Sequence, residues 1–298
     1  MNRNRKLFKK IGLLFALAFM MVSPIAYAAT SPGLGDASTF GILANTYTNT
    51  AGGTTINGDL GYTTPPAVSP TVNGTTHVAD TTYNQAGIDQ GTALTALNNQ
   101  PCTFTFAPGA IDLASDTTHG PAGVYTPGVY CIDGAASIGG GGTITLTGSG
   151  TYIFRMDGAL TTSANSVVAF SNGTSACDVW WTPTAATTLG ADSIFMGTDI
   201  DASGITIGNN VTWTGRALAF GGTVSTDADT ITVPTCATTT PDDEEEEDTT
   251  TDDDSITGET PGLPNAGVGP QHILEFSGLG VVFIALSTIY ITRKKFNF

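Results

Sequence analysis

The chain has 298 residues, with 10 Lys and Arg against 26 Asp and Glu, so its net charge is −16. Arg155 and Arg216 are the only cations between positions 11 and 292, whereas eleven of the acids crowd residues 242–259. The middle of the chain therefore lacks the positive charge that neutralises phosphate, which excludes nucleic-acid binding. It also has no Gly-rich loop followed by Lys-Ser/Thr to hold a nucleotide. Sparse charge with a slightly positive mean hydropathy is typical of a folded domain.

Residues 1–28 have the parts of a secretory signal peptide. Basic residues precede position 11, an apolar run follows over 11–22, and Ala26-Tyr27-Ala28 supplies a small-x-small cleavage site. The apolar run is too short to span a bilayer comfortably. The sequence therefore predicts export and cleavage after Ala28, and the alternative is an uncleaved N-terminal anchor.

An acidic tract and a short motif follow the middle domain, which we place at 29–237. The tract, residues 238–262, is rich in Thr, Asp and Glu, so it repels itself and is expected to form a solvated stalk. Residues 263–298 then open with a motif that resembles a sortase sorting signal. In such a signal a transpeptidase cuts before the final glycine and couples the new C-terminus to the cell envelope. The predicted motif residues are Leu263, Pro264, Asn265, Ala266 and Gly267.

The last part of the chain predicts a membrane helix. A hydrophobic stretch at about 276–292 ends in Arg293-Lys294-Lys295, and such a basic tail stays cytoplasmic. The alternative to a sortase substrate is a single-pass C-terminal anchor in which the motif occurs by chance. Both interpretations place the domain outside the cell, tethered to its surface.

The four cysteines suit an extracellular location. None has the CxxC spacing of a metal site, and disulfides form in oxidising compartments. Three pairings are open to four cysteines. Proximity in sequence favours Cys102 with Cys131 and Cys177 with Cys236, and the second bond would attach the last strand to the body of the domain.

Residues 137–234 read as short strands separated by Gly, Asn, Asp and Ser turns. Four segments share one pattern: an apolar or Thr residue, a small turn residue, Ala or Asn, Asp or Asn, and then a strand. They begin at Thr162, Leu189, Ile207 and Thr226, and the last two intervals are 18 and 19 residues. A period of that length with one sharp turn per repeat indicates the coils of a β-solenoid, and an immunoglobulin-type sandwich is the alternative. Residues 55–60 match 212–217 in pattern, so the first strands are expected to join the same solenoid.

One helix is predicted, over residues 80–97. Asp80 is placed to cap its N-terminus. Its two glycines weaken it in isolation, so it is expected to be stabilised by packing along the solenoid. The apolar positions that approximate one face are Tyr83, Ala86, Ile88, Ala93, Leu94 and Leu97.

A catalytic site needs convergent titratable groups, and this domain offers few. His77 and His119 lie in loop-like, Thr-rich surroundings and are expected to be solvated side chains. Parallel β-helix enzymes that act on acidic polysaccharides would need more than two arginines to hold the substrate carboxylates. The sequence therefore predicts no enzyme activity.

Two Asp-x-Asp pairs allow two interpretations. Asp199-x-Asp201 and Asp227-x-Asp229 carry ligands that suit Ca²⁺, but neither lies in a full nonapeptide repeat, so turn-forming aspartate is preferred. Arg216 follows a glycine within a strand, and we expect it to pair with an aspartate in a structural role.

Alternating threonines form the surface pattern most typical of a binding face. Thr-x-Thr occurs at 143–147, 212–214 and 230–232, and the two-residue period of a strand points Ile56, Trp213 and Ile231 inward. Rows about 4.8 Å apart, with alternate residues roughly 6.5–7 Å apart, would form a flat grid. Its methyl groups would cage water and its hydroxyls would anchor it. The predicted face residues are Thr55, Asn57, Thr212, Thr214, Thr230 and Thr232.

A series of ordered sequence pieces adds a family resemblance. Leu34–Ala44 followed by Ile56–Gly61 resembles the opening of the microbial ice-binding proteins of the DUF3494 type. The resemblance implies a right-handed, discontinuous parallel β-helix with one long α-helix alongside. It also implies adsorption to ice, with inhibition of recrystallisation and a modest depression of the freezing point. Further pieces continue in order to about residue 234: Pro127–Tyr130, Gly150–Arg155, Ala159–Thr162, Cys177–Trp181, Thr188–Gly190, Thr214–Ala219 and Thr230–Thr232.

The sequence thus predicts an all-β solenoid with one helix, in a non-enzymatic, surface-anchored ice-binding protein. The expected partners are an ice surface, a sortase with the cell envelope, and the membrane through the C-terminal helix. No nucleic acid, cofactor or metal is expected. The alternative is an adhesin that binds carbohydrate or another cell, in which Thr is simply a soluble strand residue and Ile194-Phe195-Met196 interrupts the rows.

Overall fold

The computed structural model describes residues 28–236. The predicted stalk, sorting motif and C-terminal hydrophobic stretch lie outside these residues, as does the signal sequence up to Tyr27. Between residues 28 and 236, no helix has the length and apolar character needed to cross a bilayer.

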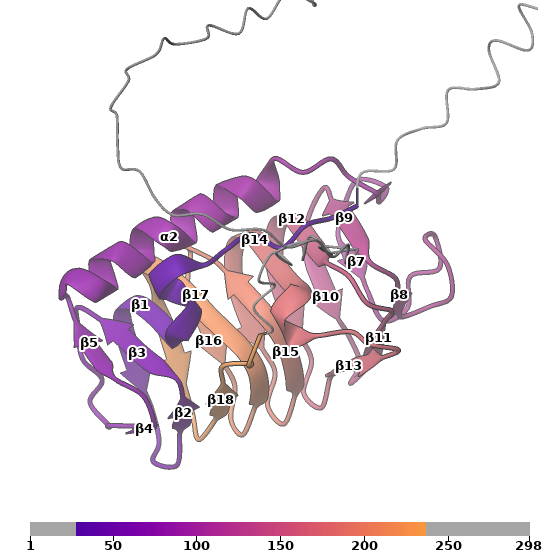
Figure 1. Cartoon of the computed structure of the whole chain (residues 1–298). Helices are drawn as coiled ribbons and strands as arrows, with labels where there is room; N and C mark the ends of the chain where they lie inside the picture. Colours follow the sequence, from indigo (N-terminus) through magenta and orange to yellow (C-terminus); the bar gives the residue numbers. More distant parts are fainter. Residues whose placement is uncertain (1–27, 237–298) are drawn as a thin grey trace, which may run out of the picture. The chain divides into compact units, whose positions relative to one another are not determined.

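The described chain is mostly strand, with one α-helix alongside (Figure 1). All of its registered strand pairs are parallel, whereas an immunoglobulin-type sandwich is built from antiparallel sheets, so the sandwich alternative is wrong. The elements are η2 (Gly35–Thr39), β1 (Phe40–Asn49), β2 (Thr55–Asn57), β3 (Asp59–Tyr62), β4 (Thr71–Val72), β5 (Thr76–Val78), α2 (Thr81–Asn98), β6 (Phe104–Thr105), β7 (Ile111–Asp112), β8 (Val124–Tyr125), β9 (Gly128–Ile132), β10 (Ala136–Ile138), β11 (Thr143–Thr147), β12 (Tyr152–Thr162), β13 (Val167–Ser171), η3 (Ala176–Asp178), β14 (Val179–Leu189), β15 (Ile194–Ile200), β16 (Ile205–Ile207), β17 (Thr212–Thr226) and β18 (Thr230–Thr232).

The long strands bend so that each contributes to more than one ladder. β17 pairs with β18 over 212–214, with β1 over 217–219, and again with β1 over 223–226. The stack therefore has three sides, and α2 runs along the one that contains the middle of β17 (Figure 1). Leu43, Trp180 and Leu218 of this side are buried together with the helix.

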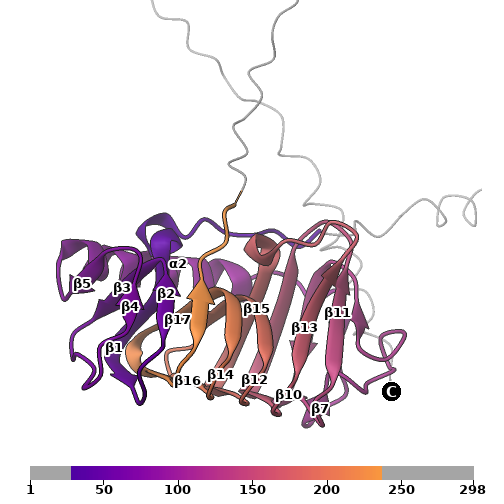
Figure 2. The same ribbon diagram turned by 90° about the horizontal axis from the view of Figure 1, so that it is seen from below.

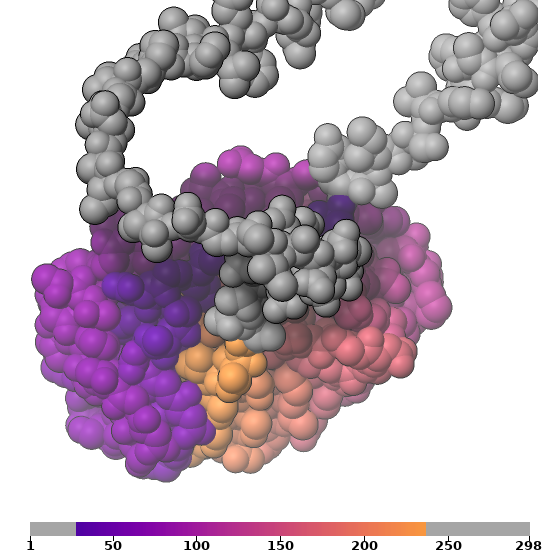
Figure 3. All heavy atoms as spheres, in the orientation of Figure 1, coloured from indigo at the N-terminus to yellow at the C-terminus, as the bar shows by residue number. Residues whose placement is uncertain are grey.

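The order of strands in the stack differs from their order in the chain. β1 pairs with β17, and β2 pairs with β18, with Thr55 opposite Thr230. Figures 1 and 3 show the N-terminal strands directly beside the C-terminal ones. The first strands thereby cover edges of the last ones, which would otherwise present unpaired backbone groups.

A column of aromatic rings fills the interior. Tyr130, Phe154, Trp181, Phe195 and Trp213 follow one another with centroid separations of 5.2, 4.4, 5.2 and 5.0 Å. Each ring comes from a successive coil and all five residues are buried. Such pairs add about 0.5–1.5 kcal/mol each beyond the burial of apolar area.

Helix α2 begins where the sequence predicted. The Asp80 side chain accepts a hydrogen bond from the Tyr83 N–H at 2.8 Å, which caps the N-terminus. Most of the predicted apolar face is buried, but Ile88 is 63 % exposed, so its inclusion was wrong. Gly87 and Gln90 face the stack instead, because Gly87 lies directly against the ring of Phe220.

Two glycines of α2 provide a matched pair for a test of this packing. We expect Gly87→Ala to destabilise the fold by about 1–3 kcal/mol, because the added methyl would overlap the Phe220 ring. This is the net effect, after the gain of about 1 kcal/mol in helix propensity that alanine brings over glycine. Gly91 has open space around its Cβ position, so Gly91→Ala is expected to stabilise by about 0.5–1 kcal/mol. Urea unfolding of the two variants measures both effects, and equal shifts would contradict the packing argument.

Candidate functional site

The six residues predicted for the binding face lie together on one side of the stack, which we name the Thr/Asn side. The residue in the middle of each of these strand segments, Ile56, Trp213 or Ile231, is fully buried. The predicted alternation of inward and outward side chains is therefore confirmed. The Cα partners run Thr55–Thr230–Thr212 in one row and Asn57–Thr232–Thr214 in the next.

Apolar residues and hydrogen bonds interrupt the Thr/Asn side. Beyond Thr212, the first row continues to Ile194, which is 41 % exposed, and then to Val167. In the second row, Asn57 Nδ2 donates to Thr232 Oγ1 at 2.9 Å. These two polar groups are therefore partly engaged with each other.

A second side of the stack carries a longer and more regular array, which the sequence prediction missed. Its hydroxyl residues are Cα partners across six consecutive strands, β1, β17, β16, β14, β12 and β10, several of which follow one another in Figure 2. We name this array the hydroxyl row. Its members are Thr48, Ser225, Thr206, Thr188, Thr161 and Ser137.

The middle of the hydroxyl row is open to solvent. Thr161, Thr188 and Thr206 are exposed, and within residues 28–236 their hydroxyls make no hydrogen bond to protein. At one end, Thr48 Oγ1 donates to Ser225 Oγ at 2.7 Å. No member of the row is charged. Because the three central hydroxyls have no hydrogen-bond partner in the described part of the protein, they are free to bond an ordered external layer of water.

The repeat pattern in the sequence contained a signal for the hydroxyl row, because the row lies one residue before the start of each aligned segment. The four aligned segments begin at Thr162, Leu189, Ile207 and Thr226, and the residue before each is a member of the row. Thr161 pairs with Thr188 and Leu189 pairs with Ile207, so these segments lie side by side in the register that the alignment predicted. Thr48 and Ser137 lie in segments that do not share the repeat, and they join the row by pairing with Ser225 and Thr161.

Sharp turns separate the hydroxyl row from the Thr/Asn side. Left-handed backbone occurs at Asn165, Asp192, Asn210 and Ala228, with φ of 62°, 59°, 61° and 60°. The first three lie at the fourth position of the repeat, where Asn and Asp tolerate this conformation. In the last repeat the turn comes one residue earlier, at Ala228. Before this turn, paired residues of neighbouring strands are 19 positions apart in sequence, as in Ile205 and Val224. After it they are 18 apart, as in Thr212 and Thr230.

The two histidines have structural partners. Nδ1 of His77 lies 2.8 Å from Asp80, and Nδ1 of His119 lies 2.8 Å from Asp116. Both side chains are largely buried, with 12 % and 3 % of their surface exposed, so the expectation that they are solvated was wrong. His119 also stacks on Tyr125 with ring centroids 4.1 Å apart.

Asp229 is a turn former, as preferred from the sequence. Its carboxylate accepts hydrogen bonds from the N–H groups of Val211 and Asp227, both at 2.7 Å. Burial raises the pKa of this carboxyl to about 6, although the two N–H donors oppose the shift. Asp201 has the same role, accepting from the N–H groups of Thr187 and Ser203 at 2.8 Å.

Both predicted disulfides are present, and an arginine lies beside each. Cys102 and Cys131 have Cα atoms 5.8 Å apart, and those of Cys177 and Cys236 are 5.7 Å apart. Arg155 donates to both sulfurs of the first bond and also to backbone carbonyls at the end of α2.

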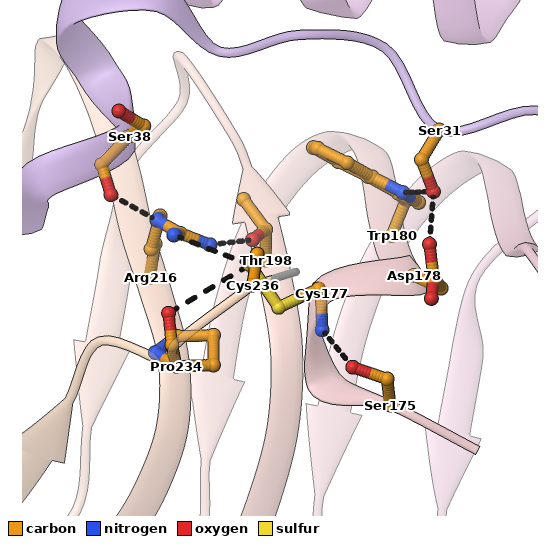
Figure 4. The surroundings of a disulfide bond; sticks show 10 residues. All are labelled: Ser31, Ser38, Ser175, Cys177, Asp178, Trp180, Thr198, Arg216, Pro234 and Cys236. Carbon is orange, nitrogen blue, oxygen red and sulfur yellow. Dashed lines mark hydrogen bonds between the residues drawn. A yellow bond between two sulfur atoms is a disulfide. The ribbon is translucent and has the colours of Figure 1, made fainter. Parts of the chain in front are cut away.

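The expected pairing of Arg216 with an aspartate is wrong. Among the described residues its guanidinium contacts no carboxylate: Nε donates to the Ser38 carbonyl at 2.9 Å, and Nη2 lies 4.0 Å from the sulfur of Cys236 (Figure 4). Burial lowers the pKa of Arg216 to about 10. The residue joins η2, β17 and the disulfide, which is a structural role.

Comparisons with known proteins agree with this architecture. The chain is 32 % identical over 241 residues to an ice-binding protein of Nostoc sp. (strain HG1), which covers 76 % of this chain and 83 % of that protein. A crystal structure of an ice-binding protein from the Antarctic ascomycete Antarctomyces psychrotrophicus superposes with a TM-score of 0.60 at 29 % identity, covering 70 % of this chain and all of that one. Another, from an Antarctic biological consortium, gives a TM-score of 0.62 at 27 % identity, covering 72 % and 97 %. The family model described as ice-binding-like matches residues 42–232, and the chain therefore belongs to the ice-binding-like family.

Proposed function

We propose that this protein binds ice and acts without enzymatic chemistry, through a flat, uncharged side of its strand stack. Family membership supports the ligand, since the relatives named above are ice-binding proteins. The observation that carries the proposal is the hydroxyl row, in which six strands place a hydroxyl at the same register. Strand pairing repeats these hydroxyls at about 4.8 Å, so methyl groups can cage water while hydroxyls hydrogen-bond it in an ordered layer.

Two sides compete for the ice contact within this proposal. The Thr/Asn side, predicted from the sequence, has one row of four threonines, since Thr71 pairs with Thr55, and one row of three polar residues before Ile194 and Met196 interrupt them. The hydroxyl row is longer, with six hydroxyl residues in succession before Asp112 follows Ser137. We therefore assign the primary contact to the hydroxyl row and a secondary one to the Thr/Asn side.

The finer fold proposed for this family member is a right-handed, discontinuous parallel β-helix. Support for the discontinuity comes from strand order: β18, at the end of the described chain, lies between β17 and β2. The N-terminal strand β2 thus stacks on the C-terminal strand β18. After α2, the chain continues at another place in the stack, where β6 pairs with β9 and β9 pairs with β12.

The cellular setting is also part of the proposal. The signal peptide predicts export, and the motif Leu263–Gly267 with the following hydrophobic stretch predicts attachment through a sortase to the envelope, or through a membrane helix. Two disulfides suit an oxidising exterior. A tethered ice binder would attach the cell to ice, or limit recrystallisation of ice at the cell surface.

Ice-affinity partitioning of the purified protein, with recrystallisation inhibition read from the same sample, tests the proposal. We expect the protein to concentrate in slowly grown polycrystalline ice and to keep the grains small. Rejection of folded protein into the liquid would contradict ice binding. In that case, sugar-dependent stabilisation or glycan-array binding would identify the molecule as an adhesin.

A further inference from the structure

One buried carboxylate in the interior is not explained by turn formation. Asp199 of β15 has the in-register partners Trp181 and Ala217, which both belong to the interior cluster. No part of its surface is exposed, and neither carboxylate oxygen has a hydrogen-bond partner among residues 28–236. An isolated buried carboxylate is costly, so a counter-charge or a proton is required at this place.

One further buried oxygen lies near this carboxylate. The hydroxyl of Thr187 also makes no hydrogen bond within the described chain. Thr187 lies near enough to Asp199 and Asp201 to lower the pKa of each, although its geometry falls short of a hydrogen bond. Burial first, and then repulsion from Asp201, raise the pKa of Asp199 well above its usual range. The cluster thus contains two interacting carboxyl groups and one hydroxyl oxygen without a hydrogen bond.

A surface pocket on the α2 side of the stack reaches one member of this cluster, Asp201. Its volume is about 470 Å³, and it lies between the C-terminal end of α2, at Leu94 and Asn98, and the strands β14 and β15. Asp201 and Thr182 line its wall, and the exposed Asp157 lines its rim. Asp201 is the member of the cluster that lines this pocket, so a small hydrated ion would approach the cluster through Asp201, on the side that α2 covers.

We propose that Asp199, Asp201 and Thr187 form a site for a hard divalent cation of the Ca²⁺ type. Carboxylate and hydroxyl oxygens are ligands for such ions, and waters from the pocket would complete the coordination. A cation would compensate both carboxylates and use the orphaned oxygens. Residues 28–236 contain no group of three or more His, Cys, Asp or Glu that could hold a metal, so with only two carboxylates we expect weak binding, with Kd of about 10⁻⁴–10⁻³ M.

Terbium luminescence tests the site directly, because Tb³⁺ substitutes for Ca²⁺ and is sensitised by nearby tryptophan. Trp181 is the in-register neighbour of Asp199, so titration of the protein with TbCl₃ should give saturable emission on excitation of tryptophan. Asp199→Asn should abolish this emission, and Thr187→Val should weaken it. Asp133→Asn is the matched control, because Asp133 is exposed and its side chain makes no hydrogen bond within the described chain. Excess CaCl₂ should displace the emission in the wild type.

Thermal unfolding gives an independent readout. At Ca²⁺ about tenfold above Kd, we expect Tm to rise by about 3–6 °C over the value in EDTA, and Asp199→Asn should show no rise. Equal terbium emission from wild type and Asp199→Asn, or a Tm insensitive to Ca²⁺, would overturn the proposal. A proton would then be the counter-charge, and acidification would stabilise the wild type more than Asp199→Asn.

Discussion

Substitution of Thr188 and Thr206 together by tyrosine should abolish partitioning into ice and leave the folded protein intact. The two residues are adjacent partners in the middle of the hydroxyl row and both are exposed. A phenol ring at each position would hold the neighbouring strands away from a flat ice surface. Loss of contact across these strands should cost at least about 1.4 kcal/mol of adsorption free energy, which is a tenfold loss of affinity. Ice-affinity partitioning and recrystallisation inhibition measure it.

The matched control is the pair Thr212→Tyr and Thr230→Tyr on the Thr/Asn side. These residues are also exposed and are adjacent partners, so they receive the same chemical change on the other side. We expect a smaller loss of ice affinity from this pair than from the first. Tm should move by less than about 2 °C in both variants, because surface substitutions change stability little. A larger loss from the control pair would transfer the primary contact to the Thr/Asn side.

Removal of the disulfide between Cys177 and Cys236, by changing both residues to alanine, should lower stability strongly. The bond closes a loop with a sequence separation of 59 residues, and loss of such a constraint costs about 4 kcal/mol. For a domain of this size that corresponds to a fall in Tm of about 8–16 °C. Calorimetry under oxidising conditions measures the shift.

The same variant should keep its ice affinity near 0 °C. Cys236 follows β18 by only a few residues, and β18 is held independently by ladders to β17 and β2. The strands of the hydroxyl row contain neither cysteine. Lost partitioning in a variant that is still folded in the cold would show that the disulfide positions the binding side, contrary to the structure.

Features with local signals were predictable from the sequence. The N-cap of α2 follows from Asp80, and the disulfide pairs followed from proximity along the chain. Exposure of Ile88 was predictable too, because at 100° per residue it lies on the opposite side of the helix from Tyr83, Ala86, Ala93 and Leu97. Its inclusion in the buried face was an error in applying the helical period. The approach of Phe220 to Gly87 was not predictable, because local periodicity contains no information about a contact with a distant strand.

The candidate site was predictable in part. A period-2 argument gave the inward and outward positions of the Thr/Asn side correctly, because these positions alternate within one strand. The hydroxyl row depends on which strands become neighbours, and pairing of Thr48 with Ser225 joins segments near opposite ends of the domain. Arg216 was assigned a carboxylate partner by charge alone, whereas its donors meet a carbonyl oxygen and a disulfide sulfur.

The position of β18 between β17 and β2 also has a kinetic consequence. The N-terminal strands cannot complete their ladders until residue 232 is available, so nascent chains that lack the last strand have no complete template on which to fold. Contacts of such long sequence separation make folding slow. A slow folder remains extended for longer after synthesis, and an extended chain is the form that passes through a narrow export channel. For the export that the signal peptide predicts, the same strand order would favour translocation before folding.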